Sequence, residues 1–286
     1  MSQPDAASEV VASRATRTGR NLPVAITVAV VLLAAVASSL FYRKELFVGL
    51  AVIAVCLGLY ELGKAFSVRD IRIPLLPVMV GTAGILISTY ISGPEALMVS
   101  FALTVGAVVV WRVIDGGGIE AVRDSAAGLF AAAYLPLMGG FVMLMLAADD
   151  GPIQVAIFIL LAVANDTGGF FAGVKFGRHP LAPTISPKKS WEGLAGSFAL
   201  TMLVGVIGAT FFLHMNPVVG VILGLITPIT ATVGDLAESL IKRDLGLKDM
   251  GTLLPGHGGV LDRLDSLLLT APFVYLMFSS ASGLPV

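Results

Sequence analysis

Residues 218–243, VVGVILGLITPITATVGDLAESLIKR, decide the fold class. The stretch carries no charge before Asp235 and ends with Lys242 and Arg243. About 20 apolar residues in a helix cross the hydrocarbon core of a bilayer. At about 1.5 Å per residue, Asp235 lies about 26 Å beyond Val218, close to the far boundary of that core. The stretch therefore predicts a membrane-spanning helix that brings a carboxylate and two basic side chains to one membrane surface.

The composition of the whole chain agrees with this class. Of its 286 residues, 56% are hydrophobic and 13% are charged, with a mean hydropathy of +0.92, whereas a soluble domain carries about 25% charged residues. The formal net charge of -1 excludes a nucleic-acid binder, which needs a concentrated basic surface. The single cysteine, Cys56, excludes an intrachain disulfide and a site of several thiolates. We therefore predict an integral membrane protein.

Polar breaks divide the apolar sequence into nine candidate spans. They cover residues 22–41, 46–60, 74–91, 97–113, 126–148, 153–174, 194–213, 218–240 and 264–280. The sequence thus predicts an all-α, polytopic helical bundle of about nine transmembrane helices. Residues 1–20 are expected to form a disordered cytoplasmic tail and residues 21–150 the N-terminal transmembrane helices. Residues 151–286, with cytoplasmic loops at 175–193 and 241–263, carry the polar motifs.

The basic residues set the orientation. Cytoplasmic segments of membrane proteins carry an excess of Lys and Arg. With the N-terminus inside, all of the 18 basic residues except Arg43 and Lys44 fall in cytoplasmic segments. We therefore expect a cytoplasmic N-terminus and, after nine spans, a C-terminus outside.

Four carboxylates are expected near the cytoplasmic ends of three spans: Asp166, Asp235, Asp262 and Asp265. An ionisable group at a helix centre costs about 2.5–3.5 kcal/mol, so such groups are candidate functional residues. An ion-coupled transporter usually holds its site near the midplane, and a channel needs polar residues along its path. Because the outer halves of the spans are nearly bare of charge, an enzyme at the cytoplasmic surface is favoured. The transporter stays the alternative from another class.

The residues Asp235, Glu238, Ser239 and Lys242 follow the i, i+3, i+4, i+7 spacing of one helical face. One interpretation is a set of intrahelical ion pairs, with Lys242 and Arg243 reaching the interface. The functional interpretation is a metal-binding carboxylate at Asp235 beside groups that bind phosphate. The spacing alone leaves both open.

The run GHGGVLDRLD, residues 256–265, is a glycine turn followed by a helix start. Asp262 could simply cap this helix, because acidic residues are favoured in a first turn. Two Asp residues around Arg263 favour phosphate binding instead, since glycine lets backbone N–H groups approach a phosphate. His257 fits a loop residue, a phosphate donor or an orienting residue.

The loop KFGRHPLAPTISPKKSWEG, residues 175–193, is basic and punctuated by proline. Ser186 and Pro187 are typical of an N-cap and a first helical residue. Lys188 and Lys189 would then lie in a first turn, where the helix dipole disfavours cations. An anion such as a triphosphate is therefore expected beside them. The alternative is an ordinary positively charged cytoplasmic loop.

Together these motifs resemble the bacterial phosphatidate cytidylyltransferases, also called CDP-diacylglycerol synthases. Every fixed position of that family's signature is filled, by Ser239, Lys242, Arg243, Lys248, Asp249, Gly251, Leu254, Pro255, His257, Gly258, Gly259, Asp262, Arg263 and Asp265. A second region is similar at Asp166, Gly177 and SPKKSWEG, although Ser190 stands where Thr is more usual and Gly168 and Gly169 where bulkier residues often occur. The similarity covers roughly residues 160–270, while the first five spans match only in hydrophobicity and number.

The resemblance implies a function and a location. It implies transfer of a cytidylyl group from CTP to phosphatidic acid, which gives CDP-diacylglycerol and pyrophosphate and depends on Mg2+. It also implies a multi-pass protein of the inner (plasma) membrane, a homodimer, and an active site within a catalytic region, residues 151–286, on the cytoplasmic side. A second cation stays open, as do two related activities: a CTP-using enzyme that acts on archaeal ether-lipid phosphates, and a polyprenol kinase.

This chemistry assigns roles to the residues. The lipid phosphomonoester is already an anionic nucleophile near neutral pH, so the obstacle is repulsion between two anions rather than a missing base. Mg2+ binds a few carboxylates together with substrate phosphates; we expect Asp235 and Asp262 to hold it first, with Asp265 and Asp166 behind them. The expected catalytic set is Asp235, Asp262, Lys189, Lys242 and Arg263, and the expected substrate-binding set is Ser186, Lys188, Lys189, Ser239, Lys242, Arg243, Lys248, His257, Gly258 and Gly259.

Overall fold

The computed structural model describes residues 22–251, 253 and 258–282. Its helices are α1 Leu22–Tyr42, α2 Lys44–Ser67, α3 Leu75–Asp115, α4 Ile119–Ala132, α5 Met138–Ala147, α6 Gly151–Phe176, α7 Trp191–Ile207, α8 Pro217–Leu245 and α9 Leu261–Ser282. Two wider helical turns, η2 Ala133–Leu137 and η3 Gly208–Phe212, join α4 to α5 and extend α7. The predicted all-α membrane bundle is confirmed, apart from one hairpin of strands β1 Pro180–Ala182 and β2 Ser186–Ser190. The tail predicted for residues 1–20 lies outside the described residues.

Within the described chain, seven helical segments are long and apolar enough to cross a membrane. The sequence predicts nine, and one difference is a reversal inside α3. Gly93 has φ 79° and precedes Pro94, and a Cβ atom on Gly81 would collide with the side chain of Thr104. In a straight helix these two residues would be about 35 Å apart. Residues 75–92 and 94–115 are therefore two antiparallel arms, at the places of the third and fourth predicted spans.

The other difference is α1, whose described part counts as a shorter apolar helix, Thr27–Tyr42. The number of membrane crossings and the side of each terminus stay predictions. Exposed apolar side chains such as Leu103, Phe171 and Phe211 are what a lipid-facing surface requires. The chain is thus a multi-pass membrane protein.

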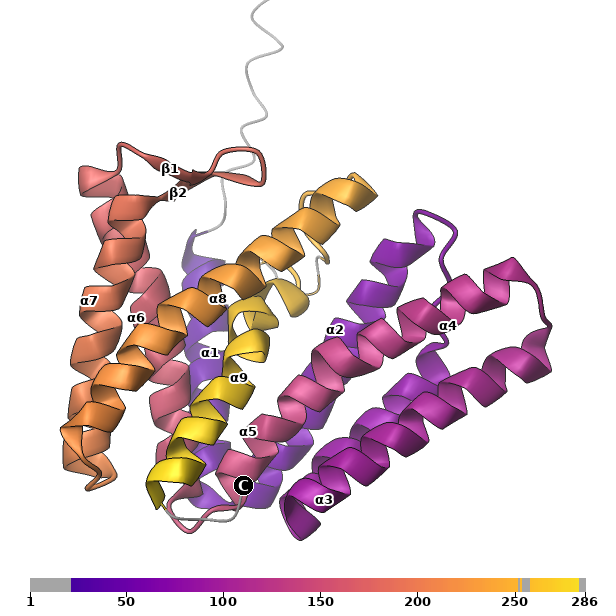
Figure 1. The fold of residues 1–286 in the computed structure, drawn as a ribbon, viewed down its shortest axis with the longest axis horizontal. Coiled ribbons are helices and arrows are strands. Elements are labelled where there is room, and N and C mark those ends of the chain that lie inside the picture. Colours follow the sequence, from indigo (N-terminus) through magenta and orange to yellow (C-terminus); the bar gives the residue numbers. More distant parts are fainter. Residues whose placement is uncertain (1–21, 252, 254–257, 283–286) are drawn as a thin grey trace, which may run out of the picture.

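The centre of the bundle joins the N-terminal and C-terminal halves of the chain. α2, α5 and α9 pack together there, with α6 and α7 at one edge and α3 and α4 at the other (Figure 1). Leu59 of α2, Leu135 of η2 and Leu261 of α9 are fully buried. A Cβ atom on Gly58 would lie 2.9 Å from Leu135 Cδ2 and 3.9 Å from Leu261 Cδ1. The small residue on α2 therefore leaves room for the side chain of Leu135.

Glycines also bring α6, α7 and α8 together. A Cβ atom on Gly168 of α6 would collide with the carbonyl oxygen of Gly196 on α7, and one on Gly169 would lie 2.8 Å from Ser197 Oγ. A Cβ atom on Gly220 of α8 would likewise collide with the carbonyl oxygen of Gly205 on α7. The glycines at 168 and 169 thus allow α6 to pack closely on α7, which in turn packs closely on α8.

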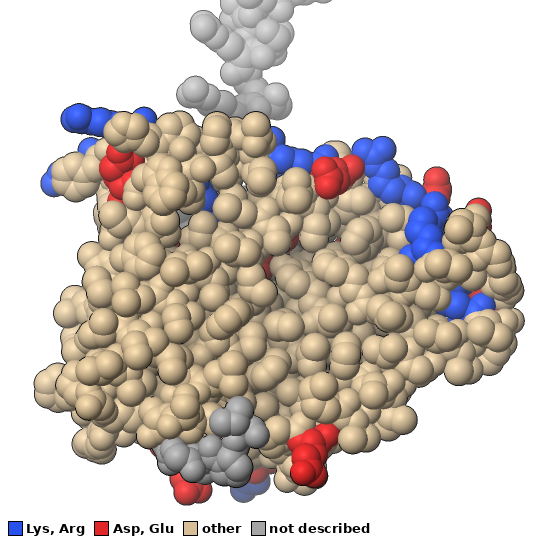
Figure 2. Space-filling view, in the orientation of Figure 1, with Lys and Arg blue, Asp and Glu red and all other residues tan. Residues whose placement is uncertain are grey.

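Charge is distributed unevenly along the bundle. Lys and Arg side chains gather at the end of the molecule that carries the β1–β2 hairpin, and a band almost without charge lies below them (Figures 1 and 2). The last turn of α8, with Lys242 and Arg243, lies at this end. The polar motifs of the sequence therefore occupy the basic end of the bundle.

Candidate active site

A polar cavity of about 280 Å3 lies where α8 approaches its end and α9 begins. Its walls are formed by Asp166, Asp235, Lys242, Asp249, Asp262, Arg263, Asp265 and Ser266. The four carboxylates that the sequence places at one membrane surface thus share one cavity, although they come from three helices. Close packing of α6, α7, α8 and α9 produces this convergence.

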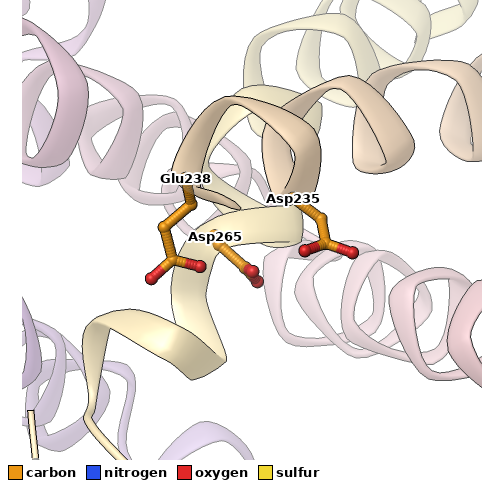
Figure 3. A group of neighbouring side chains, drawn as sticks. All are labelled: Asp235, Glu238 and Asp265. Atoms are coloured by element: carbon orange, nitrogen blue, oxygen red, sulfur yellow. The ribbon is translucent and has the colours of Figure 1, made fainter. Parts of the chain in front are cut away.

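Three acidic side chains form a tight cluster at this cavity. Among the described residues, oxygen atoms of Asp235, Glu238 and Asp265 all lie within 4.8 Å of one another. Asp235 and Glu238 extend from one face of α8, and Asp265 lies between them on the neighbouring α9 (Figure 3). A Cβ atom on Gly234 would lie 2.6 Å from the carbonyl oxygen of Asp265, so glycine permits this approach. The sequence places Glu238 in the polar stripe but does not assign it to the metal site, whereas the structure places it in the cluster.

Glu238 is the unusual member of the cluster. Its side chain is 0% exposed, and within the described part of the chain neither carboxylate oxygen has a hydrogen-bond partner. Lys242 Nζ lies 3.3 Å from Glu238 Oε2, and Lys189 pairs with Asp235. Three carboxylates therefore face two lysines, and burying an uncompensated charge is costly. The donor set fits a divalent cation, because Mg2+ prefers carboxylate oxygens combined with phosphates and water.

Asp262 lies outside this cluster and is already engaged. Its Oδ1 is 3.0 Å from Lys242 Nζ and accepts the N–H of Met250 at 3.3 Å, while its Oδ2 accepts the N–H of Gly259 at 2.8 Å. Gly258 has φ 86°, a conformation that favours glycine. Asp262 lies in the first turn of α9 and thus bonds backbone that precedes the helix, including the Gly259 N–H predicted to meet a phosphate.

The helix start predicted at Ser186 is wrong. Residues Ser186–Ser190 form strand β2, which pairs antiparallel with β1. The helix α7 begins at Trp191 instead, with Ser190 as its N-cap, whose Oγ accepts the N–H of Gly193 at 3.1 Å. Both serines are suitable caps, and the later one is used because the preceding residues pair as a hairpin.

The correction moves Lys188 and Lys189 from a helical turn to a strand, where successive side chains point to opposite faces. Lys189 forms an ion pair with Asp235, whereas Lys188 is exposed. Both line a second cavity of about 230 Å3 between α6, β2, α7 and α8, which shares Asp166 and Asp235 with the first. Asp166 Oδ1 accepts the Asn165 Nδ2–H at 3.1 Å and lies outside the three-carboxylate cluster. The two lysines therefore line a cavity that Asp235 of the acidic cluster also lines. Their binding of phosphate stays a prediction.

The other predicted residues are less central. Ser239 Oγ lies 3.4 Å from Asp235 Oδ1, one helical turn away. Arg243 and Lys248 are exposed and line neither of the two cavities. His257 lies outside the described residues.

Sequence reasoning missed Glu61 of α2, which lies beneath the turn that precedes α9. Its Oε2 accepts the N–H of Leu261 at 2.9 Å. The span predicted over residues 46–60 ends just before Glu61, whereas α2 continues to Ser67. The signal available in the sequence was a single carboxylate at the end of a long apolar run.

Comparison with known proteins identifies the class. The Cytidylyltransferase family matches this chain over residues 23–281. A phosphatidate cytidylyltransferase of Mycobacterium leprae is 35% identical over 278 residues, which cover 92% of this chain and 89% of that protein. One of Mycobacterium bovis is 33% identical over 280 residues, with coverage of 94% and 92%, and one of Staphylococcus aureus is 29% identical over 234 residues, with coverage of 80% and 89%.

The chain therefore belongs to the cytidylyltransferase family. The resemblance of its motifs to the phosphatidate cytidylyltransferases is confirmed, and so is the prediction that it is an enzyme of this group.

Proposed function

We propose that this enzyme transfers the cytidylyl group of CTP to phosphatidic acid, which forms CDP-diacylglycerol and releases pyrophosphate. The observation that carries the proposal is the cluster of Asp235, Glu238 and Asp265, which lies beside a polar cavity and is paired with Lys189 and Lys242. The names of the relatives support this pair of substrates.

The reaction requires one displacement at phosphorus. A phosphate oxygen of the lipid forms a bond to the α-phosphorus of CTP, and the bond from that phosphorus to pyrophosphate breaks with its electron pair on pyrophosphate. The nucleophile is already anionic near neutral pH, so the protein must mainly neutralise and align two anions. Lys189, Lys242 and Arg263 line the two cavities and can contact phosphate oxygens.

Asp235, Glu238 and Asp265 are the residues that would hold Mg2+. The ion would neutralise the charge that develops on the phosphates. Lys242 keeps a fixed position between Glu238 and Asp262, which orients its charge toward the cavity. Asp262 is then a residue that holds the preceding turn rather than the first metal ligand. A second cation and a homodimer stay predictions.

We place the reaction at the cytoplasmic face of the inner membrane. Lys and Arg gather at one end of the bundle (Figure 2), and cytoplasmic ends carry this excess. The cavity is lined by Lys242 near the end of α8 and Arg263 at the start of α9. CTP is available on that side, and the lipid headgroup lies at the same interface.

The test is a product analysis with purified enzyme in lipid nanodiscs, supplied with CTP, phosphatidic acid and Mg2+. We expect equal amounts of pyrophosphate and a lipid that carries cytidine monophosphate, and no turnover after chelation of Mg2+. Diacylglycerol, which lacks the attacking phosphate, is the matched control and should give no product. Release of CDP with a phosphorylated lipid would identify a kinase and refute the proposal.

A further inference from the structure

Glu61 is a buried acidic residue that the reaction described above does not use. It lies on α2, is 2% exposed, and contacts a segment of the chain about 200 residues away. Its Oε2 accepts the N–H of Leu261, the first residue of α9, at 2.9 Å. The N–H groups of Leu253 and Val260 also lie near the carboxylate. Glu61 thus supplies from another helix the negative charge that favours the N-terminus of α9.

Two glycines of the signature enclose this carboxylate. A Cβ atom on Gly251 would collide with Glu61 Oε1, and one on Gly259 would lie 2.5 Å from Glu61 Oε2. Neither position has room for a side chain while the carboxylate is in place. The glycines at 251 and 259 are therefore explained by the approach of Glu61, in addition to any contact with a substrate.

Gly259 lies between Glu61 and a residue of the reaction cavity. The same Cβ atom on Gly259 would also lie 2.9 Å from Asp262 Oδ2, which accepts the Gly259 N–H at 2.8 Å. Asp262 also accepts the N–H of Met250 and pairs with Lys242. Two carboxylates, from α2 and α9, thus approach the same glycine.

A third cavity, of about 220 Å3, is lined by Glu61 and shares Asp249 with the reaction cavity. Asp249 is thus part of the wall of both cavities, and the N–H of the next residue, Met250, is bonded to Asp262. Displacement of this wall would move Asp262, Lys242 and Arg263 together, because the first two are bonded to each other and the third follows Asp262 in α9.

We propose that Glu61 is a positioning residue that fixes the backbone around Gly251 and Gly259, so that Lys242 and Arg263 face the substrate phosphates in the geometry the reaction needs. The inference rests on the proposed function. The carboxylate accepts the Leu261 N–H through Oε2, and its Oε1, which has no hydrogen-bond partner among the described residues, fills the space beside Gly251. The amide of glutamine keeps one acceptor oxygen but removes the charge and places an NH2 group at the other position, for example in the space beside Gly251.

The test compares Glu61→Gln with Glu45→Gln, an acidic residue at the other end of the same helix. For each folded variant, kcat, KM for CTP, KM for phosphatidic acid and the unfolding temperature are measured in nanodiscs. We expect Glu61→Gln to lower kcat at least tenfold with nearly unchanged KM values and unfolding temperature, and Glu45→Gln to match the wild type. Gly251→Ala, which displaces the carboxylate but keeps its charge, should also lower kcat.

Two results would overturn the inference: a wild-type kcat in folded Glu61→Gln or Gly251→Ala, or an activity loss that only follows the folded fraction. If Glu61→Gln does not fold, Gly251→Ala decides alone. A wild-type enzyme that forms no cytidylylated lipid would instead refute the proposed function, so the two failures are distinguishable.

Discussion

Replacement of Glu238 by glutamine tests the acidic cluster most sharply, because it separates binding of the metal from stability of the fold. The substitution preserves the shape of the side chain and removes one charge from a fully buried position. We expect the variant to fold and to lose most of its affinity for Mg2+.

The expected magnitudes follow from the distances. Glu238 Oε2 lies 3.3 Å from Lys242 Nζ, which at an effective dielectric constant of about 20 gives an attraction of about 5 kcal/mol. Oxygens of Glu238 and Asp265 lie within 4.8 Å, and their repulsion is at least about 3.5 kcal/mol on the same scale. Asp235 adds a weaker repulsion, because it is 35% exposed and paired with Lys189. The repulsions offset most of the attraction, so the free energy of unfolding should fall by no more than about 2 kcal/mol.

The effect on binding of a divalent cation is not offset in this way, because all three carboxylates attract the cation. Loss of a residue that only orients a ligand typically weakens metal binding about 10- to 100-fold, so loss of a ligand should weaken it at least about 100-fold. The assay is a Mg2+ titration of pyrophosphate release, with thermal unfolding measured on the same preparation. Glu95→Gln, at an exposed position on the turn of α3, is the matched control. An unchanged Mg2+ dependence in Glu238→Gln would refute the metal assignment, and a collapse of thermal stability would show that Glu238 is a structural residue.

Three further predictions follow. Asp235→Asn should abolish formation of the cytidylylated lipid while membrane insertion is retained; turnover like that of the wild type would remove Asp235 from the site. Lys189→Ala should raise KM for CTP or phosphatidic acid more than it lowers the unfolding temperature, and unchanged KM values for both substrates would contradict its role. Asp124 is 2% exposed and lies 3.1 Å from Arg112 Nη2, so Asp124→Ala should destabilise the fold by about 3 kcal/mol while kcat per folded molecule is kept; equal stability would show that the pair contributes nothing.

Much of the arrangement was predictable because a membrane restricts the chain to helices of known rise. Counting residues from the span boundaries was enough to place Asp166 and Asp235 at similar depth, and both line the same cavity. The break between the third and fourth predicted spans corresponds to the reversal at Gly93.

Features that depend on packing between elements were not predictable. Ser186 and Ser190 are both good caps, and local sequence does not choose between them. The choice is made by the β1–β2 pairing and by Glu192 Oε2, which accepts the N–H groups of Arg178 and His179 at 3.1 and 3.3 Å. These contacts form only once the hairpin lies against α7.

The membership of the acidic cluster is a second example. Asp262 and Asp265 are three residues apart on α9, and the rotation of that helix decides which of them meets Asp235. Close approach at Gly234 turns Asp265 toward α8, while Asp262 is held by Lys242, Met250 and Gly259. Glu238 of α8 belongs to the cluster because the same close approach of α8 and α9 brings it near Asp265.

The most direct measurement of the central claim is anomalous X-ray diffraction from crystals of the enzyme grown with Mn2+ in place of Mg2+. We expect an anomalous peak at coordination distance from the carboxylates of Asp235, Glu238 and Asp265, and no such peak in Glu238→Gln crystals grown in the same way. A peak bound by Asp262 and Asp166 without Glu238, or no peak near the cavity in crystals that contain CTP, would contradict it.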